Sequence, residues 1–310
     1  EIVDCDWSSD VCSSDLVAAT PCCTSAGDSS RAGSWPKHHH RRRTRLDRVG
    51  RAGGLSHGDA LMSNPGVPES LRELIRSELA APTLVAHVSI LVGAGVPLIV
   101  AGGADRTTRN LVADSFATAS PLAAGVSEIE IAEGERFSWL ADPQGVGCTI
   151  EGAGAAPRSP RSVRLRARAL LDGLDPTIAR TLVRSLVRGY QLISAAASPD
   201  LASLLDGLRS SPYRIPEDDL LRLGVVLFID ATEGARVSGV APSGRLASAY
   251  LLHAPGAPSG RRAPTLLASW NERSSDWDDF AWAAVPDLAA RTGSRHGDYA
   301  ALLADRERLL

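Results

Sequence analysis

Short apolar runs alternate with segments of helical periodicity through the middle of the chain. Pro97–Ala101 (PLIVA) and Val225–Asp230 (VVLFID) are typical of buried strands. Ser127–Ala132 alternates polar and apolar residues as a strand does, and Val163–Leu171 does the same before it ends in two leucines. Thr107–Ala117 is expected to form a helix after the first strand. Strands and helices in alternation predict an α/β fold.

Two further helices carry start and stop signals. In Asp175–Gly189, the aspartate is placed to cap the helix, Pro176 occupies its first turn, and the glycine ends it. Ser198–Ser210 repeats the capped pattern, and Tyr190–Ala196 between the two helices predicts another strand. The apolar stripes of the two helices are Ile178, Leu182, Val183 and Leu186, and Leu201, Leu204, Leu205 and Leu208.

The longest apolar run, Leu84–Ala104, approaches the length of a membrane-spanning helix. It contains His87, Gly93, Gly95 and Pro97, which interrupt a helix of that length. We therefore expect a helix, a turn and a buried strand here, with a transmembrane helix as the alternative.

The first 61 residues are expected to lie outside the fold. Asp6–Leu16 (DWSSDVCSSDL) is what a common sequencing adapter encodes in one reading frame, and no apolar periodicity follows before Met62, the only methionine. We expect the protein to start at Met62 and residues 1–61 to be a disordered leader. The alternative is a basic arm around His38–Arg43 that binds nucleic acid or a metal.

Composition narrows the function classes for residues 62–310. Cys148 is the only cysteine there, which excludes a disulfide framework and a cysteine zinc site and favours a cytoplasmic protein. The same residues include no lysine, 25 arginines and 28 acidic residues, which gives a net charge of −3. An acidic balance argues against nonspecific nucleic-acid binding as the main function.

Two segments carry a family resemblance, which extends from about Ser70 to the end. Gly189–Ile229 and Leu266–Leu310 resemble parts of the ATPases of type II secretion, type IV pilus assembly and type IV secretion. The resemblance implies an α/β fold with a mostly parallel, RecA-like P-loop NTPase sheet flanked by helices, in residues 62–233. It also implies a small β-plus-helix extension in residues 234–310.

The resemblance places the phosphate loop after the strand Pro97–Ala101. A P-loop needs glycines that let backbone amides wrap the phosphates, a lysine, and a hydroxyl for Mg²⁺. With the usual spacing from Gly102, the Gly-Lys-Thr positions hold Thr107, Thr108 and Arg109, whereas a shorter loop puts Arg106 in the lysine position. If a nucleotide is bound, Gly102, Gly103, Arg106, Thr107 and Thr108 are therefore the expected contacts for ATP and Mg²⁺. The alternative is an ordinary glycine-rich turn that binds nothing.

The other catalytic positions of the family are changed in this sequence. Gly173 takes the position of the carboxylate near Mg²⁺, and Asp172, one residue earlier, is a candidate metal ligand or a strand-end residue. Gly189 and Tyr190 replace a Gly-His pair, and Ala195–Ser198 replaces an element that contains a histidine. The scattered histidines are expected in the core or on the surface.

These changes predict a degenerate secretion or pilus-assembly ATPase-like subunit with a structural or regulatory role and no catalytic residues. Its expected partners are related ATPase subunits or platform proteins of the membrane, in a homo- or hetero-oligomer, at the inner face of the membrane through those partners. The alternative is a weak ATPase that uses Arg106, Thr107 and Thr108. A third hypothesis is a nucleic-acid-binding relative that uses the arginines of Val163–Ala169, although no specific nucleic acid is expected.

The family architecture also predicts strand neighbours. Pro97–Ala101 and Leu170–Gly173 (LLDG) should lie side by side and parallel, because the loop after the first and the end of the second share one phosphate site. Val225–Asp230 should be buried on both faces. The arginines in Val163–Ala169 alternate with apolar residues, which fits either a functional surface or a half-exposed strand.

Overall fold

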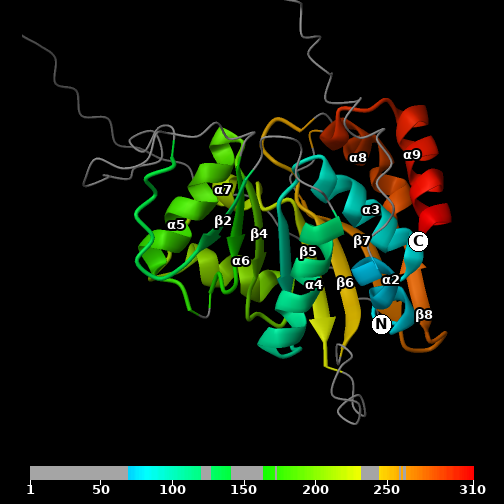
Figure 1. Cartoon of the computed structure of the whole chain (residues 1–310), viewed down its shortest axis with the longest axis horizontal. Coiled ribbons are helices and arrows are strands. Elements are labelled where there is room, and N and C mark those ends of the chain that lie inside the picture. Colours follow the sequence, from blue (N-terminus) through cyan, green and yellow to red (C-terminus); the bar gives the residue numbers. More distant parts are fainter. Residues whose placement is uncertain are drawn as a thin grey trace, which may run out of the picture. The chain divides into compact units, whose positions relative to one another are not determined.

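The computed structural model describes residues 69–119, 127–140, 163–171, 173–231, 244–257, 260 and 263–310. The chain divides into two units, Glu1–Ala52 and Gly53–Leu310, and all of these residues belong to the second. They form an α/β structure around one sheet of eight strands (Figure 1). The strands are β1 Leu98–Ala101, β2 Ser127–Ile131, β3 Val163–Ala167, β4 Gln191–Ala195, β5 Val225–Asp230, β6 Arg245–Leu251, β7 Thr265–Asn271 and β8 Asp276–Asp279.

The α/β class is confirmed, but the sheet is mixed, so a mostly parallel sheet is not confirmed for the sheet as a whole. Its strand order is β2-β3-β4-β1-β5-β6-β7-β8. The four pairings from β2 to β5 are parallel, and the three from β5 to β8 are antiparallel. Helices separate β1 from β2, β3 from β4 and β4 from β5, whereas the described residues between β5 and β8 include no helix, which is the connection that antiparallel pairing allows.

The predicted contact between PLIVA and LLDG is wrong. Strand β4 lies between β1 and β3, and the described residues of LLDG, which are Leu170, Leu171 and Gly173, lie beyond the end of β3 and outside any strand. Strand β4 is buried along its whole length and is largely apolar, so it is stable with a neighbour on each side. Strands β1, β4 and β3 run parallel to one another. Burial of VVLFID is confirmed, because β5 lies between β1 and β6 and only Asp230 is exposed.

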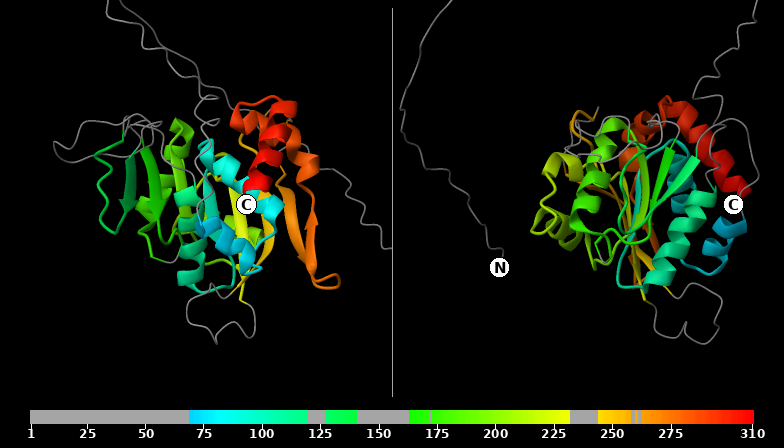
Figure 2. Two further views of the ribbon diagram at one scale, coloured as in Figure 1. Left: turned by 45° about the vertical axis from the view of Figure 1, so that its right-hand side comes forward. Right: turned by 60° about the vertical axis from the view of Figure 1, so that its left-hand side comes forward.

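Helices cover both faces of the sheet. One layer contains α2 Glu69–Arg76, α3 Pro82–Gly93, α4 Arg106–Ala119, α8 Val285–Thr292 and α9 His296–Leu309. The other contains α5 Pro176–Ser185, η3 Leu186–Arg188, α6 Leu201–Arg209 and α7 Glu217–Leu220, and the short helix η5 Ala281–Ala284 follows β8. Figure 2 shows the two helical layers on opposite sides of the strands.

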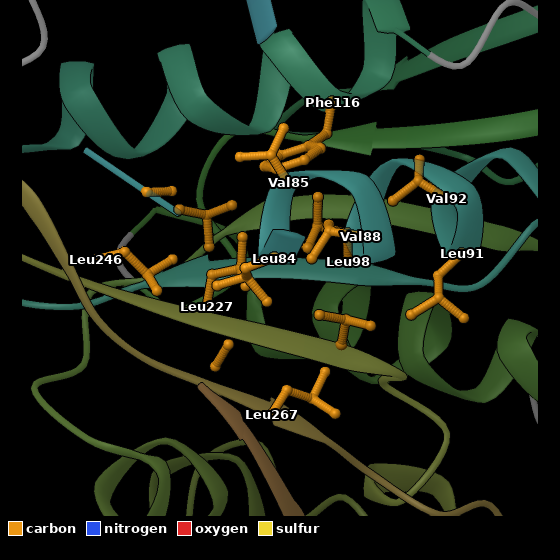
Figure 3. Packing of buried hydrophobic residues seen from close by; sticks show 14 of the residues in the cluster. Leu84, Val85, Val88, Leu91, Val92, Leu98, Phe116, Leu227, Leu246 and Leu267 are labelled. Carbon is orange, nitrogen blue, oxygen red and sulfur yellow. The ribbon is translucent and has the colours of Figure 1, made fainter. Parts of the chain in front are cut away.

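Alternate residues of each central strand point into different cores. Leu98 and Val100 of β1 pack with α2, α3, α4, α8 and α9, whereas Ile99 and Ala101 pack with α5, α6 and α7. Figure 3 shows the first core, where α3 lies against the sheet near Leu98 and Leu227. A strand between two such cores has to be apolar on both sides, which explains the continuous apolar runs of β1 and β5.

The helix, turn and strand predicted for the long apolar run are confirmed. Helix α3 ends at Gly93, Gly95 turns the chain with φ +89°, and β1 follows. Among the described residues, we find no helix whose length and apolar character would allow it to cross a membrane. The apolar residues of α3 are instead buried by the sheet and by α9.

The predicted helix signals of the second half are also confirmed. Asp175 accepts a hydrogen bond from the Thr177 amide at 2.8 Å, and Asp200 accepts one from the Ser203 amide at 2.8 Å. Gly189 takes the left-handed conformation with φ +86°, after the 3₁₀ turn that ends the α5 segment. These caps involve residues close in sequence, which makes them readable from the sequence alone.

Candidate functional site

The candidate site lies at the carboxyl end of β1, where a loop of four residues, Gly102–Asp105, leads into α4. Gly102 has φ +116°, and a Cβ at this position would lie 2.2 Å from the Ile229 carbonyl oxygen. Only glycine fits, because both the backbone conformation and the contact with β5 exclude a side chain. The loop therefore lies directly against the end of β5.

Two amides of this loop are bonded to neighbouring strand ends. The Gly102 amide donates to the Ser198 carbonyl at 2.8 Å, and the Ala104 amide donates to the Ile229 carbonyl at 2.9 Å. In a P-loop, amides of the loop instead surround the phosphates. Neither of these two amides is available to a ligand in this structure.

Asp105 caps the N-terminus of α4. One carboxylate oxygen accepts from the Thr108 amide and the other from the Thr108 hydroxyl, each at 2.9 Å. These hydrogen bonds, led by the one from the Thr108 amide and with a further one from the Thr107 amide, hold the pKa of Asp105 below its ordinary value. An internal anion thus occupies amides that favour a phosphate at a helix N-terminus.

Arg109 fixes the loop from the inside. Its guanidinium is buried, and it donates to the Ala104 carbonyl at 2.6 Å and to the Gly102 carbonyl at 3.2 Å. The carbonyl groups of the loop are therefore directed at a cation of the same chain. The sequence alone places Arg109 at the hydroxyl position of the family's loop and does not predict these hydrogen bonds.

The predicted contacts for a nucleotide are only partly accessible. Gly102 and Thr108 are buried, whereas Gly103, Arg106 and Thr107 are exposed. Sequence reasoning missed Asp105, although an aspartate directly before a helix is a capping signal that could have identified it.

The structure brings together two regions that the family resemblance places at one phosphate site. A Cβ on Gly173 would lie 3.9 Å from Nη2 of Arg106. Arg106 at the start of α4 and the segment after β3 are therefore neighbours in space. Asp172, the candidate metal ligand, lies outside the described residues.

The arginines of β3 are buried, so the interpretation of this segment as a half-exposed strand is wrong. Arg164 donates through Nε to the Gln191 side chain at 2.9 Å and through Nη1 to the Ala117 carbonyl at 2.8 Å. Arg166 pairs with Asp114 on α4, and burial lowers its pKa to about 10. These polar groups on α4 and β4 permit two cations in a buried strand.

Arg168, just beyond β3, is the exposed member of this series. Its Nε lies 2.5 Å from Glu130 of β2, and its Nη1 lies 3.7 Å from Asp114. Glu128 of β2 lies 3.7 Å from Nε of Arg166. The acidic residues of β2 thus serve as partners for arginines of the adjacent strand and of its continuation.

Two histidines are buried in contacts with hydroxyl groups. His87 Nδ1 lies 2.7 Å from the Tyr299 hydroxyl, and His253 Nε2 lies 2.8 Å from the Thr265 hydroxyl. His296 is exposed. In the part of the chain that the structure describes, no group of three or more His, Cys, Asp or Glu side chains is arranged to hold a metal ion.

Comparison with models of known families and with curated protein sequences found no match. The functional argument therefore depends on the geometry of this chain. Its strongest feature is a loop at the carboxyl end of a central parallel strand, which is where α/β sheets bind ligands. In this chain, that loop is bonded to side chains and carbonyls of the protein itself.

Proposed function

We propose that this chain is a RecA-like subunit related to the secretion and pilus-assembly ATPases, and that it acts in assembly without hydrolysing ATP. The RecA-like part of the proposal is supported by the parallel pairing of β1 to β5 and by the helices on both faces of that part of the sheet.

The observation that carries the proposal is the Asp105 carboxylate at the N-terminus of α4. A phosphate at this helix end would have to displace Asp105 from the Thr108 amide and hydroxyl. It would also be repelled by the negative charge of that carboxylate. Loop length adds to this effect, because four residues between β1 and α4 give few amides to wrap a phosphate chain.

Hydrolysis would further require catalytic groups that this sequence lacks at the positions implied by the resemblance. Residues 62–310 contain no lysine. Gly173 stands at the position of the carboxylate near Mg²⁺, and the residue that directly follows β3 is Arg168. Loss of one preorganised group of this kind costs on the order of 3 kcal/mol, which is about a hundredfold in rate. We therefore assign the chain a structural or regulatory role, with related ATPase subunits or membrane platform proteins as partners in the cytoplasm.

The weak-ATPase alternative is favoured by one observation. Arg106 is exposed, and its guanidinium lies near Gly173, where a transferred phosphoryl group would be expected. An arginine can pair with phosphate, but its planar fork does not reproduce the compact lysine ammonium of a P-loop. The nucleic-acid alternative has less support, because Arg164 and Arg166 are buried.

Phosphate release and calorimetry with ATP and Mg²⁺ test the proposal. We expect the full chain to show no turnover and no resolved heat of binding, and an Arg106→Ala variant to behave in the same way. Turnover of about one per second that disappears in Arg106→Ala would instead establish the weak ATPase.

An Asp105→Gly variant tests the cause. Glycine at a helix N-cap costs only a few tenths of a kcal/mol, so the fold should survive while the amides become free. We expect weak ATP binding to appear in this variant. Asp200→Gly is the matched control, because Asp200 caps α6 in the same manner at a different place. Equal gains in both variants would show a general property of helix ends and contradict a blocked nucleotide site.

A further inference from the structure

Strand β8 forms one outer edge of the sheet in the described part of the chain. Strand β8 pairs with β7 alone, and it lies at the outer edge of the sheet in Figures 1 and 2. The Phe280 amide donates to the Leu267 carbonyl at 2.8 Å, in register with the β7–β8 pairing. Because hydrogen-bonded and non-bonded pairs alternate along antiparallel strands, the amides and carbonyls of Trp277 and Asp279 are directed away from β7. The Trp277 amide donates to the Asp276 side chain at 2.8 Å, so the Trp277 carbonyl and the backbone groups of Asp279 are the ones offered to a partner.

A large exposed aromatic side chain follows this edge. Trp282 is 74 % exposed, more than any other large apolar side chain among the described residues. The Asp279 side chain accepts from the Ala281 amide at 2.8 Å and so fixes the turn from β8 into η5. Trp282 is therefore held close to the end of the open strand by a defined local structure.

The charge of this edge determines what can add to it. Between Asn271 and Asp279 the chain has four acidic residues and one arginine. Two copies of the chain would therefore repel each other where their β8 edges meet, which is a common way to prevent self-association of open strands. At the opposite edge, Glu128 and Glu130 of β2 lie beside Arg166 and Arg168 instead. A cationic strand would be attracted to the β8 edge instead.

We propose that β8 and Trp282 form a docking edge for a basic, extended segment of a partner protein. The segment adds a strand to the sheet through the Trp277 carbonyl and the outward backbone groups of Asp279. Its arginine or lysine side chains face Asp276 and Asp278, and one of them stacks on the Trp282 indole. The inference goes beyond the proposed role of the loop after β1 and does not depend on it.

Calorimetry with synthetic peptides on the full chain tests this edge at about 150 mM salt. The probe is a ten-residue peptide of alternating arginine and valine. The control peptide has the same sequence and charge, but its amides are N-methylated at every second residue on the side that would face β8. Strand addition predicts that the methylated peptide binds at least about tenfold more weakly. Equal binding of the two peptides, or no binding of the first, would overturn the proposal.

Two matched variants test the side chains. We expect Trp282→Ala to weaken binding of the unmodified peptide about tenfold, because exposed aromatic residues are frequent anchors of interfaces. Leu111→Ala is the control, since Leu111 is an exposed apolar residue on α4, away from this edge. An equal loss in both variants would contradict the assignment of the docking edge to β8 and Trp282.

Discussion

At the scale of single residues, the loop after β1 depends on a few contacts that leave little room for a ligand. Gly102 allows the backbone to approach Ile229, Asp105 bonds the first turn of α4, and Arg109 bonds the loop carbonyls. The Arg109 guanidinium thus bonds the carbonyl groups of the loop, and the Asp105 carboxylate bonds the first turn of the helix that follows. The same residue types occur in nucleotide loops, but here their hydrogen bonds stabilise the fold itself.

Gly102→Ala should destabilise the protein more than Gly95→Ala does. Both glycines have positive φ, so alanine at either position is strained by the backbone conformation. Only at Gly102 would the new Cβ also lie 2.2 Å from the Ile229 carbonyl oxygen, whereas nothing lies within 4 Å at Gly95. We expect a difference of at least about 1–3 kcal/mol in the free energy of unfolding by urea. Equal losses would show that β5 moves away from the loop at little cost.

At the scale of elements, helix caps and the apolar strands could be predicted from the sequence, because their signals are local. The burial of β3 could not be predicted in this way. Its arginines alternate with apolar residues, and the groups that neutralise them, Asp114 and the Ala117 carbonyl on α4, are distant in sequence. The loop after β1 shows the same difference. The cap by Asp105 is a local signal in the sequence, whereas the hydrogen bonds to Ser198 and Ile229 join residues distant in sequence.

The contact between α3 and α9 is another such pairing of distant elements. His87 and Tyr299 are both buried, and their rings are stacked with centroids 5.8 Å apart. Burial lowers the pKa of His87 and raises the pKa of the Tyr299 hydroxyl. The folded state therefore favours a neutral ring and a protonated phenol, joined by one hydrogen bond.

Tyr299→Phe should lower the free energy of unfolding by about 1–3 kcal/mol, because it removes the hydrogen-bond partner of a buried imidazole nitrogen.

The lowered pKa of His87 means that the unfolded chain binds the proton more tightly. Stability should therefore decrease as pH falls below the ordinary histidine pKa of about 6.5. Urea unfolding of Tyr299→Phe and of a His87→Phe variant between pH 5 and about 8 measures both effects. A pH dependence that persists unchanged in His87→Phe would assign it to another group.

At the scale of the whole molecule, strand order was the feature that sequence reasoning placed least well. The apolar runs identified β1 and β5, but nothing in their composition says which strand lies beside which. Strand β4 was recognised as a strand, and its position between β1 and β3 follows only from packing on both faces. The family resemblance also suggested a boundary near residue 233, whereas β6, β7 and β8 continue the same sheet beyond β5.

This continuity predicts one cooperative unfolding transition for the described part of the chain. Leu251 of β6 and Leu192 of β4 are both fully buried, one in each core and one on each side of residue 233. Replacing either by alanine should cost about 2–5 kcal/mol and shift the same transition, because β1 and β5 belong to both cores. Differential scanning calorimetry measures this directly. Two transitions, of which Leu251→Ala shifts one and Leu192→Ala the other, would mean that residues 62–233 and 234–310 unfold as separate domains despite the shared sheet.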